Sequence, residues 1–308
     1  MTKRSRVNPR VINSGLIILL TCVPFLTPAQ TKKDLPFYSA AKLIDTEQRQ
    51  LHSKVNNQEY EIYISLPDNY VQGDSTYPVL YLTDANQYFG LIADMTRGLQ
   101  WGGEMPKAII VGIGYPLSSF KTDDERWARW LAWRMRDFSP TNTAQMDKDF
   151  GVENIKSGGA AAFLLFMEQE LFPFVEKNYR AKSGERTFVG FSLGGLFGLY
   201  TLFKEPGLFQ NYVIGSPSIW HDNKILFQIE KNYADSHHDL PGRVFMSAGE
   251  LEEEIKTGMV RNMLELNSIL KNRQYKSLNT DVAILAGETH MSAPSVCFQR
   301  GLRYLFRK

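Results

Sequence analysis

The stretch that decides the fold is Arg186-Thr187-Phe188-Val189-Gly190-Phe191-Ser192-Leu193-Gly194-Gly195. Its centre has the form G-x-S-x-G, with a short apolar run before it and a second apolar run after it. This arrangement predicts a sharp strand-to-helix turn that lifts a serine hydroxyl clear of the sheet, with glycines where the backbone passes closely. A small-residue turn that only packs a helix on a strand is the alternative. The flanking runs favour a nucleophile, and we predict that Ser192 is that nucleophile.

Apolar runs of the same kind lie on both sides of this stretch, at 78–82, 108–112, 243–247 and 281–285, with a weaker run at 212–214. Continuous apolar runs are typical of strands that are buried on both faces, as in parallel sheets. An alternating strand pattern covers 60–66, and helical patterns cover 161–179 and 253–273. This alternation predicts an α/β fold, a mostly parallel central sheet with helices on both faces. Ligands of such folds bind at the carboxyl ends of the strands.

The first 29 residues have the pattern of a signal peptide. Four basic residues are followed by an apolar run over 11–26 and by Thr27-Pro28-Ala29 as a cleavage site. An uncleaved membrane anchor is the alternative, but the run is shorter than the roughly 20 residues that a spanning helix needs. A lipid-modified Cys22 is a second alternative. We therefore predict a signal peptide at 1–29 and a single domain at 30–308, exported to the periplasm or secreted, without stable membrane insertion after cleavage.

Composition and charge argue against a nucleic-acid-binding protein and against a disulfide-stabilised one. Of the 308 residues, 43% are hydrophobic and 22% are charged, which is ordinary for a globular protein. The leader carries four positive charges and no acid, so the net charge of +2 becomes −2 for residues 30–308. This balance gives no electrostatic reason to expect a nucleic-acid partner. Without Cys22 only Cys297 remains, which excludes an internal disulfide and predicts a buried thiol in a C-terminal helix.

A serine nucleophile needs a base, and the sequence offers five histidines. In folds with this turn the chain order is serine, then acid, then histidine. His290 follows the last predicted strand and fits both the order and the position. His221 is the alternative, while His52, His237 and His238 lie before the serine or in polar stretches.

The sequence offers several candidates for the acid and for the second amide of the oxyanion hole. Four glutamates follow the strand at 243–247, at positions 250, 252, 253 and 254, and Asp222 follows the preceding strand. Most of these glutamates would suit a helix N-terminus. The oxyanion hole is expected to combine the amide of Leu193 with one from the loop 83–89, which Asp84 would shape.

Five motifs together resemble a known family: 77–84, 134–140, 190–196, 216–220 and 287–290. They are similar to the esterase branch of the α/β-hydrolases, which includes enterochelin and salmochelin esterases, feruloyl and acetylxylan esterases, S-formylglutathione hydrolase and mycolyltransferases. The siderophore-esterase group looks most similar, and the resemblance covers about 45–306. It implies that Glu252, three residues after Gly249, is the acid, and that Ala85, where Gly is common, supplies the second oxyanion amide. His221 stands where other members have a second Trp.

The segment 126–136 distinguishes this chain, because it interleaves four Arg with three Trp. Guanidinium and indole groups beside an esterase site suit an anionic or aromatic substrate. We therefore name Arg129, Arg134 and Trp220 as candidate substrate-pocket residues. The alternative is an amphipathic segment that packs its Trp side chains on the core.

These observations predict an exported serine esterase that needs no metal and no cofactor. Ser192 would form an acyl-enzyme, His290 would carry the proton, and Glu252 would orient His290. The predicted substrate is a small-molecule ester, with a catecholate siderophore as the leading candidate. The alternatives are a carbohydrate esterase of the feruloyl or acetylxylan type, an acyltransferase on the same scaffold, and a non-catalytic binding protein.

Overall fold

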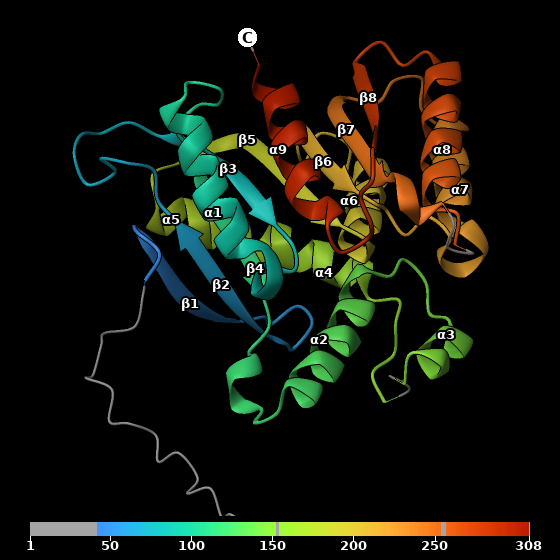
Figure 1. Cartoon of the computed structure of the whole chain (residues 1–308), viewed down its shortest axis with the longest axis horizontal. Coiled ribbons are helices and arrows are strands. Elements are labelled where there is room, and N and C mark those ends of the chain that lie inside the picture. The colour runs from blue at the N-terminus through green and yellow to red at the C-terminus, as the bar shows by residue number, and fades with distance from the viewer. Residues whose placement is uncertain (1–41, 152–153, 254–256, 308) are drawn as a thin grey trace, which may run out of the picture. The chain divides into compact units, whose positions relative to one another are not determined.

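A single eight-stranded sheet runs through the described chain in the order β1-β2-β4-β3-β5-β6-β7-β8 (Figure 1). The computed structural model describes residues 42–151, 154–253 and 257–307, so the expected signal peptide lies outside it. The strands are β1 Thr46–His52, β2 Glu59–Ser65, β3 Tyr77–Leu82, β4 Ile109–Gly114, β5 Ala181–Phe191, β6 Asn211–Gly215, β7 Gly242–Gly249 and β8 Leu278–Leu285.

The sheet is parallel from β4 to β8, and only β1 and β2 are antiparallel to their neighbours. The expected apolar runs form β3, β4, β5, β6 and β7, and the central strands are buried on both faces. The run at 281–285 was expected to be buried on both faces, and this is wrong. It belongs to β8, which among the described strands pairs with β7 alone at the edge of the sheet, and Ile284 is 47% exposed.

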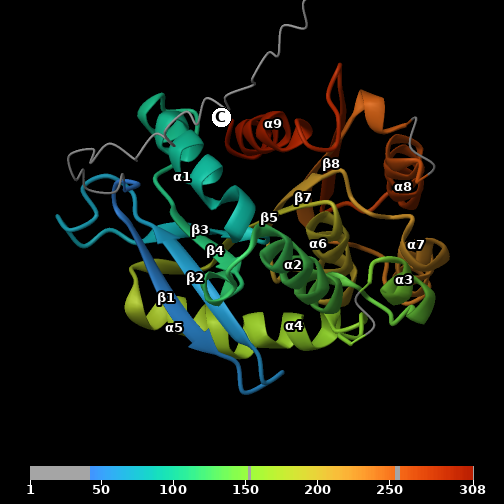
Figure 2. The ribbon, with the colours of Figure 1, turned by 60° about the horizontal axis from the view of Figure 1, so that its bottom comes forward.

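Helices cover both faces of the sheet, which confirms the predicted α/β-hydrolase fold (Figure 2). One face carries α1 Ala85–Trp101 and α9 Ala293–Phe306, which pack a separate apolar cluster with Phe89 and Phe298. The other face carries the larger cluster. Its helices are α2 Asp123–Phe138, α4 Ala160–Phe166, α5 Phe172–Asn178, α6 Leu193–Lys204, α7 His221–Ala234 and α8 Met259–Arg273, and the short α3 Ala144–Asp149 precedes α4.

Two expected helices differ from the prediction. The pattern at 161–179 forms α4 and α5 joined by a π-helical turn, η2 Met167–Leu171. Pro173 follows this turn at the start of α5 and removes one backbone donor there. Of the pattern at 253–273, residues 254–256 lie outside the described residues, and α8 begins at Met259, directly after Gly258 with its left-handed φ of 60°.

Cys297 is fully buried in α9, as expected. Burial raises the pKa of this thiol to about 12, so it stays protonated and packs as a small apolar group. Residues 43–308 form one compact unit, whereas the expected domain boundary at 29/30 lies outside the described residues. None of the described helices is long and apolar enough to cross a membrane.

Loops at the carboxyl ends of the parallel strands are tied to one another. The amide of Thr83, after β3, donates to the carbonyl of Val189 in β5 at 3.1 Å. The amide of Leu251, after β7, donates to the carbonyl of Glu288, after β8, at 3.1 Å. These bonds bring the strand ends together at one edge of the sheet.

Candidate active site

Ser192 occupies a strained turn between β5 and α6. Its φ of 59° and ψ of −120° lie outside the regions that side chains ordinarily adopt. Strain of this kind costs about 1–3 kcal/mol and persists where surrounding contacts enforce it. Here the amide of Ser192 donates to Gly215 in β6 at 2.9 Å, and its carbonyl accepts from the amide of Ser218 at 3.1 Å. The predicted strand-turn-helix geometry is therefore present.

Close packing explains the glycines of the motif. A Cβ atom on Gly190 would collide with the carbonyl of Gly194. One on Gly194 would collide with the side chain of Thr83 and lie 3.2 Å from Oδ2 of Asp84. Glycine at 194 therefore lets the loop after β3 approach the serine turn.

Glu252 and His290 form a short hydrogen bond from adjacent loops. Nδ1 of His290 lies 2.6 Å from Oε2 of Glu252. The other carboxylate oxygen accepts from the hydroxyl of Ser216 at 2.6 Å and from the amide of Gly249 at 2.8 Å. Glu252 sits in the 3-10 turn η3 Glu250–Glu252 after β7 and is fully buried. These contacts fix both the carboxylate and the imidazole.

The environment keeps Glu252 ionised. Burial by itself raises the pKa of Glu252, but the hydrogen bonds from His290, Ser216 and the amide of Gly249 outweigh it, and the pKa lies below its usual value. The ionised Oε2 accepts a hydrogen bond from Nδ1–H of His290, so the proton of the neutral imidazole is held at Nδ1 and Nε2 keeps its lone pair.

The other candidate acids contact different groups. Oε2 of the exposed Glu250 accepts from the amide of Gly287 at 2.9 Å, and Oδ2 of Asp222 accepts from the hydroxyl of Thr141 at 2.6 Å. The structure thus brings Glu252, and neither of these two, to His290. The other candidate base, His221, is fully buried, and neither of its ring nitrogens has a hydrogen-bond partner among the described residues.

The histidine lies beside the serine turn. Its ring packs on that of Phe191, the residue before Ser192, with centroids 4.9 Å apart. Oγ of Ser192 lies 3.4 Å from Oγ of Ser218, and within the described chain no hydrogen bond joins it to His290. Such contacts are often long in the absence of substrate and tighten when it binds.

Leu193 and Ala85 occupy equivalent places in two helices. Leu193 is the first residue of α6, and Ala85 is the first residue of α1. The first amides of a helix have no acceptor within the helix, so they are available to an oxyanion. Their role as an oxyanion hole stays a prediction.

Arg134 has a different place from the one expected for a substrate-pocket residue. It is buried, and its guanidinium binds the fully buried carboxylate of Asp84 through Nε–Oδ1 and Nη2–Oδ2, both at 2.9 Å. The physical reason is that a buried carboxylate requires a charged partner. Arg134 therefore holds the residue that precedes Ala85, and its Cζ lies 4.5 Å from the ring centroid of Trp130.

Most of the other arginines in the segment 126–136 form ion pairs with neighbouring acids. Arg136 binds Asp137 at 2.6 Å, and Arg126 binds Asp123 at 2.5 Å. Arg129 is exposed, with Cζ 5.6 Å from the ring centroid of Phe120. Trp130 is buried but Trp127 is 51% exposed, so the segment packs its Trp side chains on the core only in part. Among the described residues, Arg129 is the only arginine of this segment without an acidic partner.

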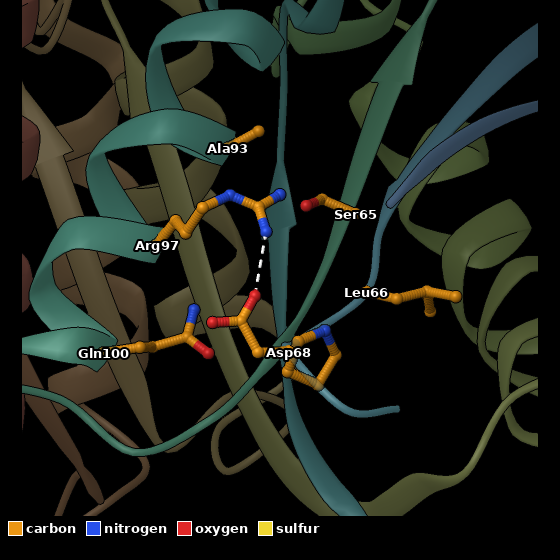
Figure 3. Close-up of a pocket in the computed structure, with 7 residues that line it drawn as sticks. Ser65, Leu66, Asp68, Ala93, Arg97 and Gln100 are labelled. Carbon is orange, nitrogen blue, oxygen red and sulfur yellow. Dashed lines mark hydrogen bonds and ion pairs between the residues drawn. The ribbon is translucent and has the colours of Figure 1, made fainter. Parts of the chain in front are cut away.

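Two cavities lie at opposite ends of the strands, and they differ in volume. A groove of about 310 Å³ lies beside Trp220, which follows β6. A cleft at the opposite end of the sheet is lined by Arg97 and Asp68, which pair at 3.0 Å (Figure 3). That cleft holds about 10 Å³, room for about one water molecule and for no substrate. Among the described residues no cluster of His, Cys, Asp and Glu could hold a metal ion.

Comparison with known proteins identifies the family. The family model described as "Putative esterase" matches residues 53–291. The chain belongs to this esterase family. The chain is 33% identical over 269 residues to the ferri-bacillibactin esterase BesA of Bacillus subtilis (strain 168), covering 84% of this chain and 89% of that one. It is 26% identical over 276 residues to the siderophore triacetylfusarinine C esterase of Aspergillus fumigatus, covering 80% and 88%.

A solved structure agrees with this assignment. The BES protein from Bacillus cereus has a TM-score of 0.73 and 32% identity, over 88% of this chain and 98% of that chain. These comparisons confirm the expected resemblance to the siderophore-esterase group and the prediction of an enzyme that acts on ester bonds.

Two serines of the motif at 216–220 lie at the site, and the sequence analysis assigned them no role. Ser216 donates to Glu252, and Ser218 lies beside the Ser192 hydroxyl. Both flank Pro217 directly after β6. Their position after a strand of the parallel sheet was the available signal, because all such strand ends meet at the site.

Proposed function

We propose that the protein is an exported serine esterase that hydrolyses siderophore esters through an acyl-enzyme on Ser192. The hydrogen bond of 2.6 Å between Glu252 and His290 beside the strained serine turn carries this proposal. It supplies a histidine with a defined tautomer next to a hydroxyl that the backbone presents above the sheet.

The chemistry follows from these positions. The Ser192 hydroxyl turns from Ser218 towards His290, and Oγ attacks the ester carbonyl carbon while Nε2 of His290 takes its proton. The amides of Leu193 and Ala85 stabilise the resulting oxyanion. The intermediate expels the alcohol, which takes the proton from His290. Water then attacks the acyl-enzyme in the same way and releases the acid and free Ser192.

Two considerations support a siderophore ester as the substrate. The relatives named above are esterases of two different siderophores, which points to the class more than to one molecule. The signal-peptide pattern at 1–29 would bring the enzyme to compartments where imported or environmental ligands arrive.

Hydrolysis assays on the purified protein test the mechanism. Ser192→Ala and His290→Ala should each lower kcat/KM by about 10³-fold or more, and the double variant should lose little more, because the residues act as one unit. His238→Ala changes an exposed loop histidine and is the matched control. Retained activity in Ser192→Ala would place the chemistry elsewhere.

A substrate panel tests the specificity. It contains a siderophore triester, feruloylated and acetylated oligosaccharides, and a simple aryl ester. The siderophore ester should have the highest kcat/KM. A tenfold preference for the sugar esters, about 1.4 kcal/mol of transition-state binding, would contradict the siderophore proposal and leave the serine mechanism intact.

Export has a separate test. Cell fractionation should recover the protein outside the cytoplasm, with an N-terminus that follows Ala29. A cytoplasmic protein that retains residues 1–29 would contradict this part of the proposal.

A further inference from the structure

The groove beside Trp220 has a distinct chemical character. It is formed where the beginnings of α7 and α8 meet, and its lining residues are Trp220, Lys224, Thr257, Arg261 and Asn262. An indole ring and two cationic side chains therefore face one hollow of about 310 Å³. The volume is at the lower end of the range for small-molecule sites.

Three polar atoms of this lining are buried without a hydrogen-bond partner among the described residues. They are Nε1 of Trp220, Oγ1 of Thr257 and Oδ1 of Asn262. Asn262 is itself 1% exposed, and its Nδ2 donates to the carbonyl of Thr257 at 2.9 Å. Leaving buried polar groups unpaired is costly. All three atoms belong to residues that line this groove, so turning these side chains towards the groove would let a ligand with polar groups satisfy them.

The two cations can turn to a ligand at low cost. Lys224 pairs with Glu265 and Arg261 pairs with Glu253, both at 3.3 Å and both largely exposed. Exposed ion pairs contribute only about 0–1 kcal/mol. A ligand anion in the groove would add to these pairs or replace them.

A second groove beside the oxyanion loop has the opposite balance. It has about 360 Å³ and is lined by Asp123, Asp124, Arg126 and the rings of Trp127 and Trp130, among others. Its two carboxylates and one guanidinium make it unfavourable for an anion. The two grooves thus differ in the charge of the residues that line them.

The Trp220 groove is close enough to the serine to act on the same substrate. Trp220 is two residues after Ser218, whose Oγ lies 3.4 Å from that of Ser192. Two residues span about 7 Å at most. The backbone of Trp220 therefore lies near the serine turn, after the same strand, β6, that Ser218 follows.

We propose that the groove of Trp220, Lys224 and Arg261 binds the negatively charged aromatic part of the ester substrate. The indole packs against the ring, and the two cations attract its charge. Nε1 of Trp220 and the hydroxyl of Thr257 donate to its oxygens, and Oδ1 of Asn262 accepts from a hydroxyl group on the ring. This proposal rests on the proposed function, because it assigns a subsite to the same reaction. It replaces the Arg126–Arg136 segment as the expected anion site.

Binding of ligands that are not esters tests the groove independently of hydrolysis. Titration calorimetry on the full chain compares 2,3-dihydroxybenzoate with its uncharged amide, 2,3-dihydroxybenzamide. The carboxylate should bind at least tenfold more tightly. Lys224→Gln and Arg261→Gln should each weaken its binding by threefold or more and leave the amide unchanged. Equal affinities of the two ligands would overturn the proposal.

Lys231→Gln is the matched control, because Lys231 is an exposed, ion-paired lysine of the same helix and lies outside the groove. An equal loss in Lys231→Gln, or no loss in the two groove variants, would show that the groove is not the site. If Ser192→Ala retained hydrolysis while the binding pattern held, the serine mechanism would fail and the groove would stand.

Discussion

Arg134 and Asp84 form a two-point ion pair directly beneath the start of α1, with both nitrogen–oxygen distances at 2.9 Å. Asp84 has a left-handed backbone with a φ of 56° and precedes Ala85, the expected second oxyanion donor. The arginine therefore holds the backbone of the loop after β3, and we predict that it affects the reaction through this backbone.

Arg134→Met should lower both the free energy of unfolding and kcat. Removing one partner of a buried ion pair leaves the charge of Asp84 uncompensated, which costs about 3–5 kcal/mol of unfolding free energy. The displaced Ala85 amide should lower kcat by about 10²-fold. Urea unfolding and hydrolysis assays measure these effects. Arg129→Ala, at an exposed position of the same helix, should change the free energy of unfolding by less than about 0.5 kcal/mol. Equal effects at the two positions would contradict the assigned role.

Ser192→Gly should be inactive and more stable than the wild-type protein. Glycine relieves the strain of the positive φ, worth about 1–3 kcal/mol, against a backbone entropy cost of about 0.5–1 kcal/mol. Ser192→Ala is equally inactive but keeps a Cβ atom and thus the strain. Thermal and urea unfolding should rank the glycine variant above the alanine variant. The reverse order would show that the turn stores no strain.

Gly194→Ala should impair turnover because the added methyl group meets Thr83 and Asp84. The loop after β3 must then move away from the serine turn, and we expect kcat to fall by about 10²-fold. Gly98→Ala is the matched control, because Gly98 is also helical and has open space around its Cα. It should keep full activity and gain about 0.5–1 kcal/mol of stability. Full activity in Gly194→Ala would contradict the close approach.

Ionisation of Glu252 should make the free energy of unfolding depend on pH below about pH 4.5. Its pKa is below the usual 4.5 in the folded protein, so ionised Glu252 favours the folded state. This contribution is complete well above pH 4.5 and is lost as the pH falls below 4.5 and through the folded pKa. The stability difference between wild type and Glu252→Gln, measured by urea unfolding from pH 7 to pH 3, should shrink over that range. A constant difference would contradict the assigned ionisation.

The parts of the site that follow single strand ends could be predicted from sequence. Ser192 has a local signature, and the order of the chain selects His290. Glu252 could not be separated from Glu250 by local pattern, because the choice depends on the bonds from Ser216 and Gly249. Only the family resemblance favoured Glu252.

Pairings between distant segments could not be predicted. Nothing local to Arg134 shows that its partner is Asp84, which is 50 positions away. The Arg/Trp pattern therefore resembled a binding segment, although most of it packs against the protein. Trp220 was named as a candidate pocket residue, but Lys224 and Arg261 were not, since the beginnings of two helices bring them together at the groove. Strand β1 was also missed, because its alternation is mostly polar and exposed.

The parallel order of β4 to β8 has a consequence for how the enzyme reaches its working state. Parallel neighbours are joined by long crossover connections, and the key pairs of the site are 26, 38 and 50 positions apart in the chain. Contacts between distant positions form late and slowly during folding. After dilution from denaturant, ester hydrolysis should therefore return only when the sheet is complete. The recovery of hydrolysis should be slower than the recovery of the helical circular dichroism signal.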